Sequence, residues 1–375
     1  MACEIIQGDC LEVMKTFPDN HFSAIVTDPP YSLGFMGKIW DKTLPSMQIW
    51  QECLRITKPG GHLLAFGGTR TFHRLTCNIE DAAFEIRDCI SWLYGSGFPK
   101  SHNHFGIEGY GTALKPAYEP IIMAMKPLDG TFKQNADKWG QAGINIDGCR
   151  IGTDDTRAPA SKNALGLMND DGWKCKPMTV GSAKGRWPAN VIFDEEAAKM
   201  LDEQSGILKS GDIKPHHQFK QEKCLTHGKY NSLSGQSFPS NSGGASRFFY
   251  CAKTSSRERN EGLDSLNETK MIRYSEMAQG PTSQQTPRKP VPQKNHHPTV
   301  KPLKLMEYLI KLVMPPSNGL LLDPFAGSGT TILASKRLGF EAIGIEKQPE
   351  YCEIARARLN YMPEDPQLDM FQGTA

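Results

Sequence analysis

The residues of this chain that could do chemistry lie in two short segments, and the first is Asp-Pro-Pro-Tyr at 28–31. It follows the apolar run 23–26, which is typical of a buried strand, and two successive prolines disfavour continuation as a helix or a central strand. A carboxylate, a rigid carbonyl and an aromatic ring are therefore presented together where a strand ends. By itself the tetrapeptide could also be an ordinary turn capped by an aspartate.

The second segment is Asp-Pro-Phe-Ala-Gly-Ser-Gly-Thr at 323–330. It follows a short apolar strand and precedes a helix, and the next strand ends at Glu346. Gly327 and Gly329 allow the backbone to approach a ligand, and Glu346 can accept hydrogen bonds from both hydroxyls of a ribose. A dinucleotide site would have a third glycine where this chain has Ile332. The pattern therefore favours a nucleoside without phosphates, commonly S-adenosylmethionine, and a glycine-rich turn with no ligand is the alternative.

Predicted strands and helices alternate at both ends of the chain, as in a doubly wound parallel sheet. Two later strand-like segments, 86–94 and 120–125, are separated by a polar loop and can pair antiparallel at one edge of that sheet. The helix over 49–57 is expected to stop at the Lys-Pro-Gly-Gly of 58–61. The remaining predicted strands are 4–6, 23–26, 62–66, 320–322 and 342–345, and the remaining helices are 10–17, 70–83, 302–313, 331–338 and 349–359.

The middle of the chain, residues 128–295, has a different texture. Gly, Ser, Asn and Lys dominate, apolar periodicity is lost outside islands at 187–193 and 247–250, and 280–295 has the proline content of an extended linker. The segment carries 24 Lys and Arg against 19 Asp and Glu, whereas the flanks carry 19 against 22. We interpret it as a basic insertion that permits nucleic acid as a partner without requiring it.

Length and composition exclude several other classes of protein. A chain of 375 residues can hold a full α/β core, and no apolar run approaches the ~20 residues that cross a bilayer. We therefore expect a soluble intracellular protein with no membrane partner. The ten cysteines are scattered singly with no Cys-x-x-Cys pair, so we expect free thiols and no bound metal.

Together the two segments resemble the motifs of the amino-methylating DNA methyltransferases. Residues 28–31 match the catalytic motif and residues 323–330 match the cofactor motif, and their order in this chain is that of the β group. The His-Pro-Thr-Val-Lys-Pro of 297–302 resembles that group's additional cofactor motif. Asp9 matches an acid that such enzymes use near the adenine of the cofactor. The resemblance is especially close to enzymes carried by phages and mobile elements, and it implies the cytoplasm of a bacterial or phage-infected host cell.

The resemblance implies a Rossmann-like S-adenosylmethionine-dependent methyltransferase fold. We expect a mostly parallel seven-stranded α/β sheet with an antiparallel edge, a circularly permuted motif order and a large target-recognition insertion. The expected parts are a catalytic half at 1–127, the target-recognition insertion and linker at 128–295, an S-adenosylmethionine-binding half at 296–362 and a tail at 363–375.

The permuted order has a consequence for the predicted sheet. The strands that end at Asp323 and Glu346 should lie beside those that end near Asp9 and Asp28, so that all four acids line one carboxyl edge, where ligands of open α/β sheets bind. The cofactor-binding residues that the resemblance implies are Asp9, Thr299, Lys301, Asp323, Phe325, Ala326, Gly327, Gly329, Thr330 and Glu346.

The catalytic motif suits methylation of an exocyclic amine, which is a poor nucleophile because its lone pair is delocalised into the ring. The Asp28 carboxylate and the Pro29 carbonyl, held by Pro30, can accept its N–H groups and favour a pyramidal nitrogen whose lone pair points at the sulfonium methyl. Direct displacement then needs no covalent intermediate. Tyr31 would stack on a base flipped out of the helix, and core packing is its alternative role. Residues 35–41 form either a lid or a plain connecting loop.

The resemblance favours adenine N6 as the target, because the motif begins with Asp where cytosine-N4 enzymes more often have Ser. Cytosine N4 is the closest rival, and methylation of RNA or of a glutamine side chain is a further alternative. An alternative of another class is a non-catalytic DNA-binding or cofactor-sensing protein that retains the fold.

Double-stranded DNA is the expected partner of the enzyme. A solvated surface run is the alternative for each cationic side chain, and a homodimer, a cognate restriction endonuclease and the recognition sequence stay open. The candidates for phosphate contacts are Lys100, His102, Lys214, Lys220, Lys223 and Lys229.

Overall fold

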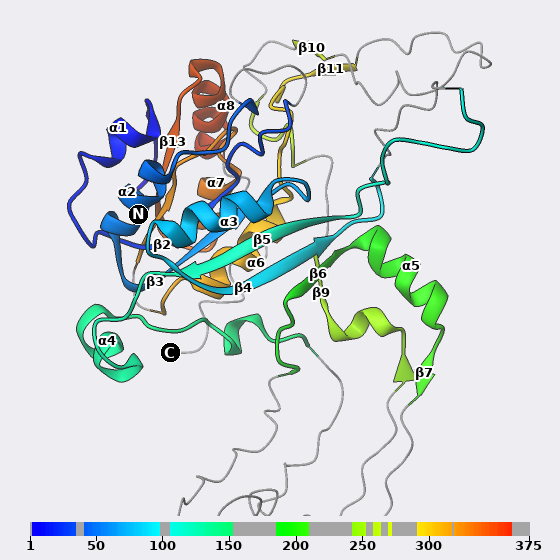
Figure 1. Ribbon diagram of the computed structural model, residues 1–375, viewed down its shortest axis with the longest axis horizontal. Helices are drawn as coiled ribbons and strands as arrows, with labels where there is room; N and C mark the ends of the chain where they lie inside the picture. Colours follow the sequence, from blue (N-terminus) through cyan, green and yellow to red (C-terminus); the bar gives the residue numbers. More distant parts are fainter. Residues whose placement is uncertain are drawn as a thin grey trace, which may run out of the picture.

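The computed structural model describes residues 2–34, 41–97, 106–152, 185–209, 242–252, 258–263, 269–271, 291–316 and 319–361 (Figure 1). Its strands are β1 (Cys3–Gln7), β2 (Phe22–Thr27), β3 (Thr57–Phe66), β4 (Glu85–Leu93), β5 (Tyr118–Met125), β6 (Val191–Asp194), β7 (Leu208–Lys209), β8 (Ser242–Gly243), β9 (Tyr250–Ala252), β10 (Thr269–Met271), β11 (Val291–Gln293), β12 (Leu320–Asp323) and β13 (Glu341–Glu346). Its α-helices are α1 (Cys10–Met14), α2 (Met47–Ile56), α3 (Phe72–Asp81), α4 (Phe132–Trp139), α5 (Glu195–Ser205), α6 (Leu303–Val313), α7 (Thr330–Arg337) and α8 (Pro349–Asn360), and the short 3-10 helices are η3 (Asp147–Cys149) and η5 (Ala245–Phe248).

Nine of these strands form one sheet in the order β1-β13-β12-β2-β3-β5-β4-β6-β9. Every neighbouring pair is parallel except the two pairs that involve β5, which runs antiparallel to β3 and to β4. The expected mostly parallel α/β sheet is therefore confirmed. Two short ribbons, β7 with β8 and β10 with β11, stand outside it.

The central strands are covered on both faces, which explains why they have continuous apolar runs in the sequence. All six residues of β2 are buried. One hydrophobic cluster packs α6 and α7 against the sheet, and a second packs α2 and α3 against the other face. Members of the first include Leu309, Ile310, Ile332 and Leu333, and members of the second include Trp50, Cys53, Ile56, Leu75 and Ile79.

Strands from opposite ends of the chain lie side by side, as the permuted motif order predicts. β1 pairs with β13 so that Gln7 is opposite Glu346, and β12 pairs with β2 so that Leu322 is opposite Ile25. Because all four strands are parallel, their carboxyl ends meet at one edge of the sheet.

The sheet differs from the expected one in its size and in the place of its antiparallel strand. Nine strands are present where seven were expected, because β6 and β9 of the 128–295 region continue the sheet beyond β4. The antiparallel β4–β5 pair was expected at the edge and instead lies inside. The insertion therefore contributes two strands to the sheet.

The boundary between α2 and β3 also differs from the prediction. Helix α2 ends at Ile56, just before the Lys-Pro-Gly-Gly of 58–61 as predicted. That segment belongs to β3, which begins at Thr57, although the strand was expected to begin at residue 62. Gly60 has φ +73°, which is a conformation that favours glycine, and it donates its N–H to the carbonyl of Lys126. A register shift between Phe22 and Ala24 accommodates this irregular start.

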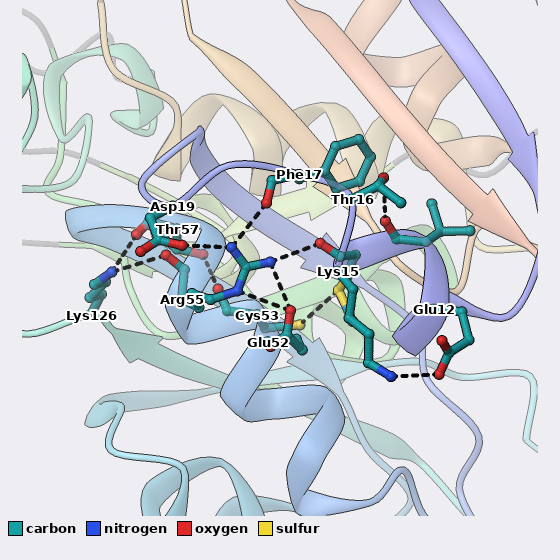
Figure 2. Close-up of polar contacts among 12 residues, drawn as sticks. Glu12, Lys15, Thr16, Phe17, Asp19, Glu52, Cys53, Arg55, Thr57 and Lys126 are labelled. Atoms are coloured by element: carbon teal, nitrogen blue, oxygen red, sulfur yellow. Dashed lines mark hydrogen bonds and ion pairs between the residues drawn. The ribbon is translucent and has the colours of Figure 1, made fainter.

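A polar network fixes the entry into β2 (Figure 2). The Arg55 guanidinium of α2 donates to the carbonyls of Met14 and Phe17 and forms ion pairs with Asp19 and Glu52. Nearby, the Lys126 ammonium donates to Asn20 and to the carbonyls of Arg55 and Thr57. These contacts tie the turn after α1 to α2 and to the end of β5, so that β2 starts at a defined place.

Several predictions fall outside the described residues. They are the DNA contacts at Lys100, His102, Lys214, Lys220, Lys223 and Lys229, most of the 35–41 loop and the tail beyond 362. Among the helices that are described, none is long and apolar enough to cross a membrane.

Candidate active site

A cavity of about 760 Å³ opens at the carboxyl ends of β1, β2, β12 and β13. Asp9, Asp28, Asp323 and Glu346 all line it, which confirms that the four acids share one edge of the sheet. The other predicted site residues on its wall are Pro29, Pro30, Tyr31, Thr299, Lys301, Phe325, Ala326, Gly327 and Thr330. Gly329 is not on the wall and lies against α8, near Ala355.

The loop after β2 is held by the carboxylate of Asp41. One oxygen of Asp41 accepts the N–H groups of Tyr31 and Ser32 at 2.7 and 2.9 Å, and the other accepts that of Leu33 at 3.2 Å. Ser32 has φ +58°, a conformation that non-glycine residues rarely adopt without such support. The Thr71 hydroxyl donates to the carbonyl of Tyr31 at 2.7 Å. Asp41 is 2% exposed, so this buried carboxylate sets the path of the loop that carries the catalytic motif.

Asp28 is the centre of a buried polar cluster. Its Oδ1 accepts the Tyr31 hydroxyl at 2.7 Å, and its Oδ2 forms an ion pair with Lys301 Nζ at 2.8 Å. The Lys301 ammonium also reaches Glu119 Oε2 at 3.1 Å and lies over the rings of Tyr31 and Phe66. Lys301 comes from the predicted cofactor motif, but its charged group contacts the catalytic motif.

The second carboxylate of this cluster, Glu119, was missed by the sequence-based prediction. It lies near the start of β5, directly before the apolar run 120–125, and its Oε2 accepts the Tyr31 hydroxyl at 3.1 Å. An acid directly before a predicted strand was the available signal. Its importance depends on β5 being antiparallel, which brings its beginning to the edge where its parallel neighbours end.

Burial dominates the electrostatics of the cluster. It raises the pKa of Asp28, while the charge of Lys301 acts in the opposite direction. The two carboxylates raise the pKa of Lys301 against the effect of its burial, so the ammonium stays protonated. Burial and both carboxylates raise the pKa of Tyr31 well above its ordinary value, so the phenol is a neutral donor.

Asp323 is a structural member of the site. It is 1% exposed and accepts the Thr27 hydroxyl at 2.6 Å and the N–H of Phe325 at 3.0 Å. Burial raises its pKa to about 6. The contact with Thr27 joins the residue before Asp28 to the start of the glycine-rich loop, so the two chemistry segments are directly connected.

Glu346 accepts backbone donors on both oxygens. The N–H of Gly327 lies 2.9 Å from one oxygen and the N–H of Gln348 lies 2.7 Å from the other. Burial is the main cause that raises its pKa to about 7. Each carboxylate oxygen has a further lone pair, so Glu346 can still accept hydroxyl groups of a ligand in the cavity.

The glycine-rich loop takes a shape that depends on its glycines. Gly327 has φ +52° and Gly329 has φ +77°. A Cβ on Gly329 would lie 2.8 Å from the Cβ of Ala355. Arg358 of α8 also fixes the loop, because its guanidinium donates to the carbonyl and hydroxyl of Ser328 and to the hydroxyl of Thr330.

The remaining predicted residues lie on the rim of the cavity. Asp9 caps α1 by accepting the N–H of Leu11 and forms an exposed ion pair with Lys347 at 3.1 Å. Thr299 belongs to the segment leading to Lys301 and donates its N–H to His297 at 3.4 Å. Within the described ranges, no three His, Cys, Asp or Glu side chains group as ligands of a metal ion.

The arrangement defines an α/β protein in which an acid- and proline-rich loop and a glycine-rich loop line one cavity at the edge of the sheet. A family model described as DNA methylase, covering N6 and N4 methyltransferases, matches residues 22–357. The chain therefore belongs to the DNA methylase family, as the sequence motifs predict. Enzymes of this family use S-adenosylmethionine.

Individual relatives match only parts of the chain. The type II methyltransferase M2.LlaDCHI of Lactococcus lactis subsp. cremoris is 50% identical over 64 residues, which are 17% of this chain and 23% of that protein. The type II methyltransferase M.HinfI of Haemophilus influenzae is 40% identical over 152 residues, which are 35% of this chain and 40% of that protein. The matched parts thus span less than half of these relatives.

Similar solved structures include a PvuII DNA methyltransferase described as cytosine-N4-specific and a complex of M1.HpyAVI with SAM. The first has 14% identity and a TM-score of 0.49 over 98% of this chain and 89% of that chain. The second has 17% identity and a TM-score of 0.42 over 95% of this chain and 99% of that chain. Likenesses of this size add nothing on substrate or target base.

Proposed function

We propose that this chain is an S-adenosylmethionine-dependent DNA methyltransferase that transfers a methyl group to the N6 amino group of adenine. The observation that carries the proposal is the sharing of one cavity by Asp28 and Glu346, two acids placed there by strands from opposite ends of the chain. Asp28 suits the amine that accepts the methyl group, and Glu346 suits the ribose of the methyl donor. The donor and the acceptor of the methyl group would therefore meet between the two acids.

The nucleoside side of the cavity fits S-adenosylmethionine by the chemistry of its donors and acceptors. Glu346 would accept the ribose hydroxyls, and Phe325 and Asp9 line the same cavity. Gly327 and Gly329 have positive φ, and Gly327 on the cavity wall has no Cβ that would project from the loop. When bound, S-adenosylmethionine supplies an electrophilic methyl group on a sulfonium.

The amine side fits an exocyclic amino group. Each oxygen of Asp28 accepts one bond in the cluster and keeps capacity for an N–H donor. Asp28 and the Pro29 carbonyl would hold the amine and concentrate its lone pair on nitrogen. No side chain of the cluster needs to become a covalent nucleophile.

Adenine is proposed over cytosine because Asp, and not Ser, stands at position 28. The 128–295 region is proposed to recognise the target sequence, and two of its strands attach it firmly to the catalytic sheet. We propose that it acts on DNA in the cytoplasm of a bacterial or phage-infected cell.

The roles are separable by paired variants. We expect Asp28→Ala to lower methyl transfer to DNA by about 100-fold or more while cofactor affinity changes little, because it removes the acceptor of the amine alone. We expect Glu346→Ala to weaken cofactor binding in a titration. Near-normal turnover of Asp28→Ala would refute the catalytic role, and unchanged cofactor affinity of Glu346→Ala would remove the ribose role.

The target base is tested by digesting methylated DNA to nucleosides and identifying the product by mass spectrometry. N6-methyladenine is the expected product. N4-methylcytosine would overturn the adenine assignment and keep the reaction type. In a parallel assay with S-adenosylmethionine that carries a labelled methyl group, label found only in RNA or protein would overturn the DNA substrate.

A further inference from the structure

Tyr31 joins two carboxylates of the active site through one hydrogen. Its hydroxyl oxygen lies 2.7 Å from Asp28 Oδ1 and 3.1 Å from Glu119 Oε2. A phenol has a single hydrogen to donate, so it can serve only one of the two carboxylates at a time. Both carboxylates are within reach of that hydrogen, which makes Tyr31 a bridge between them.

Lys301 holds the same three groups in place. Its ammonium lies 2.8 Å from Asp28 Oδ2, 3.1 Å from Glu119 Oε2 and 3.2 Å from the Tyr31 oxygen. An ammonium has three N–H donors, so these three partners use them all. The geometry of the bridge is therefore fixed before any substrate binds.

The cluster carries one more negative charge than positive, because two carboxylates face one ammonium. The side chains of Asp28, Glu119 and Lys301 are 17%, 24% and 9% exposed, so solvent screens this excess only weakly. Uptake of one proton makes the cluster neutral. Methylation of an amino group releases one proton, because the nitrogen exchanges an N–H bond for an N–C bond.

Building on the proposed methyl transfer, we propose that Glu119 is the positioning residue through which the released proton leaves Asp28. The nitrogen forms its bond to the methyl carbon, the carbon–sulfur bond breaks with its electron pair left on sulfur, and the nitrogen gives one proton to Asp28. Asp28 passes this proton to the Tyr31 oxygen while the original Tyr31 hydrogen moves to Glu119. Tyr31 stays a neutral phenol, and Asp28 is ionised again for the next base.

Glu119 is placed as the outer end of this path. Its side chain is the most exposed of the three charged groups, and its neighbour Tyr118 is 41% exposed. A proton on Glu119 can therefore pass to water, whereas the side chain of Asp28, which is 17% exposed, lines the part of the cavity where the amine would lie.

The test is a double-mutant cycle with Glu119→Gln, Tyr31→Phe and the two combined, read as kcat for DNA methylation and as cofactor affinity. Each single variant should lower kcat by about 100-fold. The double variant should lose little more than either single one, because both interrupt the same path. Cofactor affinity should stay within about twofold, and the kcat deficit of Glu119→Gln should shrink between pH 7 and pH 9 as solvent takes the proton directly.

Two further variants keep the experiment decisive. Glu85→Gln, a partly exposed glutamate at the start of β4, is the control for the same chemical change and should keep full kcat. Glu119→Asp retains a carboxylate and should be more active than Glu119→Gln, which is informative even where the glutamine variant folds poorly.

If the fold-losses in kcat of the two single variants multiply in the double variant, or if the kcat deficit of Glu119→Gln does not change with pH, Glu119 only anchors Lys301 and the inference is overturned. An active wild type together with a fully active Glu119→Gln would overturn it as well and leave the proposed function standing. A wild-type protein that binds S-adenosylmethionine but methylates no DNA would refute the proposed function and this inference with it.

Discussion

Replacing Lys301 by methionine removes the only ammonium that the described residues place between Asp28 and Glu119. Methionine keeps an unbranched apolar stem of similar length, so the change deletes the charge with little change in packing. The two ion pairs, at 2.8 and 3.1 Å, correspond to about 6 and about 5 kcal/mol of gross attraction at an effective dielectric constant near 20. Desolvation of the ions offsets most of this sum.

The net cost of Lys301→Met is the cost of leaving two largely buried carboxylates without a counter-ion. We expect the free energy of unfolding to fall by about 3–5 kcal/mol at pH 8. Without Lys301, burial and mutual repulsion raise the pKa of Asp28 beyond its already raised value. An acid whose pKa is raised in the folded state stabilises the fold at low pH, and that stability is lost as the pH rises through the folded pKa. The deficit should therefore be smaller at pH 5 than at pH 8.

Urea unfolding of both proteins across this pH range measures the deficit. Lys304→Met is the matched control, because Lys304 pairs with Glu307 at 2.8 Å from a side chain that is 45% exposed. That variant should lose no more than about 1 kcal/mol, with little pH dependence. A Lys301→Met deficit below about 1 kcal/mol, or one that is the same at pH 5 and pH 8, would refute the account of the cluster.

Three further predictions concern the loops around the cavity. Asp41→Ala removes the acceptor of three N–H groups in the loop after β2. We expect kcat to fall by about 100-fold while cofactor affinity stays nearly unchanged. Equal losses of kcat and of cofactor affinity would mean that Asp41 supports the whole cavity. Gly329→Ala should destabilise the fold by about 1–3 kcal/mol more than Gly339→Ala. Both glycines have φ near +78°, but only at Gly329 would a new Cβ lie against Ala355. Equal decreases in the thermal unfolding temperature of the two variants would contradict this. Cofactor affinity should fall by up to about tenfold per pH unit below the Glu346 pKa of about 7, because the protonated carboxyl group has lost an acceptor. A cofactor affinity that is the same at pH 8 and pH 6 would contradict the ribose role.

The elements that carry the motifs were predictable because their signals are local. Buried parallel strands have continuous apolar runs, and prolines and glycines mark where those runs end, so the strands leading to Asp28, Asp323 and Glu346 were placed correctly. The adjacency of chain ends followed from the motif order. The cavity edge lined by four acids is a consequence of these two facts.

The partners within the site were not predictable, because they depend on pairing between distant segments. Glu119 meets Tyr31 only since β5 runs antiparallel, and Lys301 reaches Asp28 across 273 positions of chain. Asp41 acts through backbone N–H groups, which leave no pattern in the sequence. The islands at 187–193 and 247–250 marked the positions of β6 and β9, but strands of four and three residues are too short for their pattern to show that they pair with the sheet.

The central claim is that this chain methylates adenine N6 in DNA at a defined sequence. Single-molecule sequencing of genomic DNA from cells that express the protein, compared with cells that express Asp28→Ala, tests it most directly. The account predicts N6-methyladenine at one recurring sequence in the first genome and its absence from the second. Unmodified DNA in both, or the same methylation with Asp28→Ala, would contradict it.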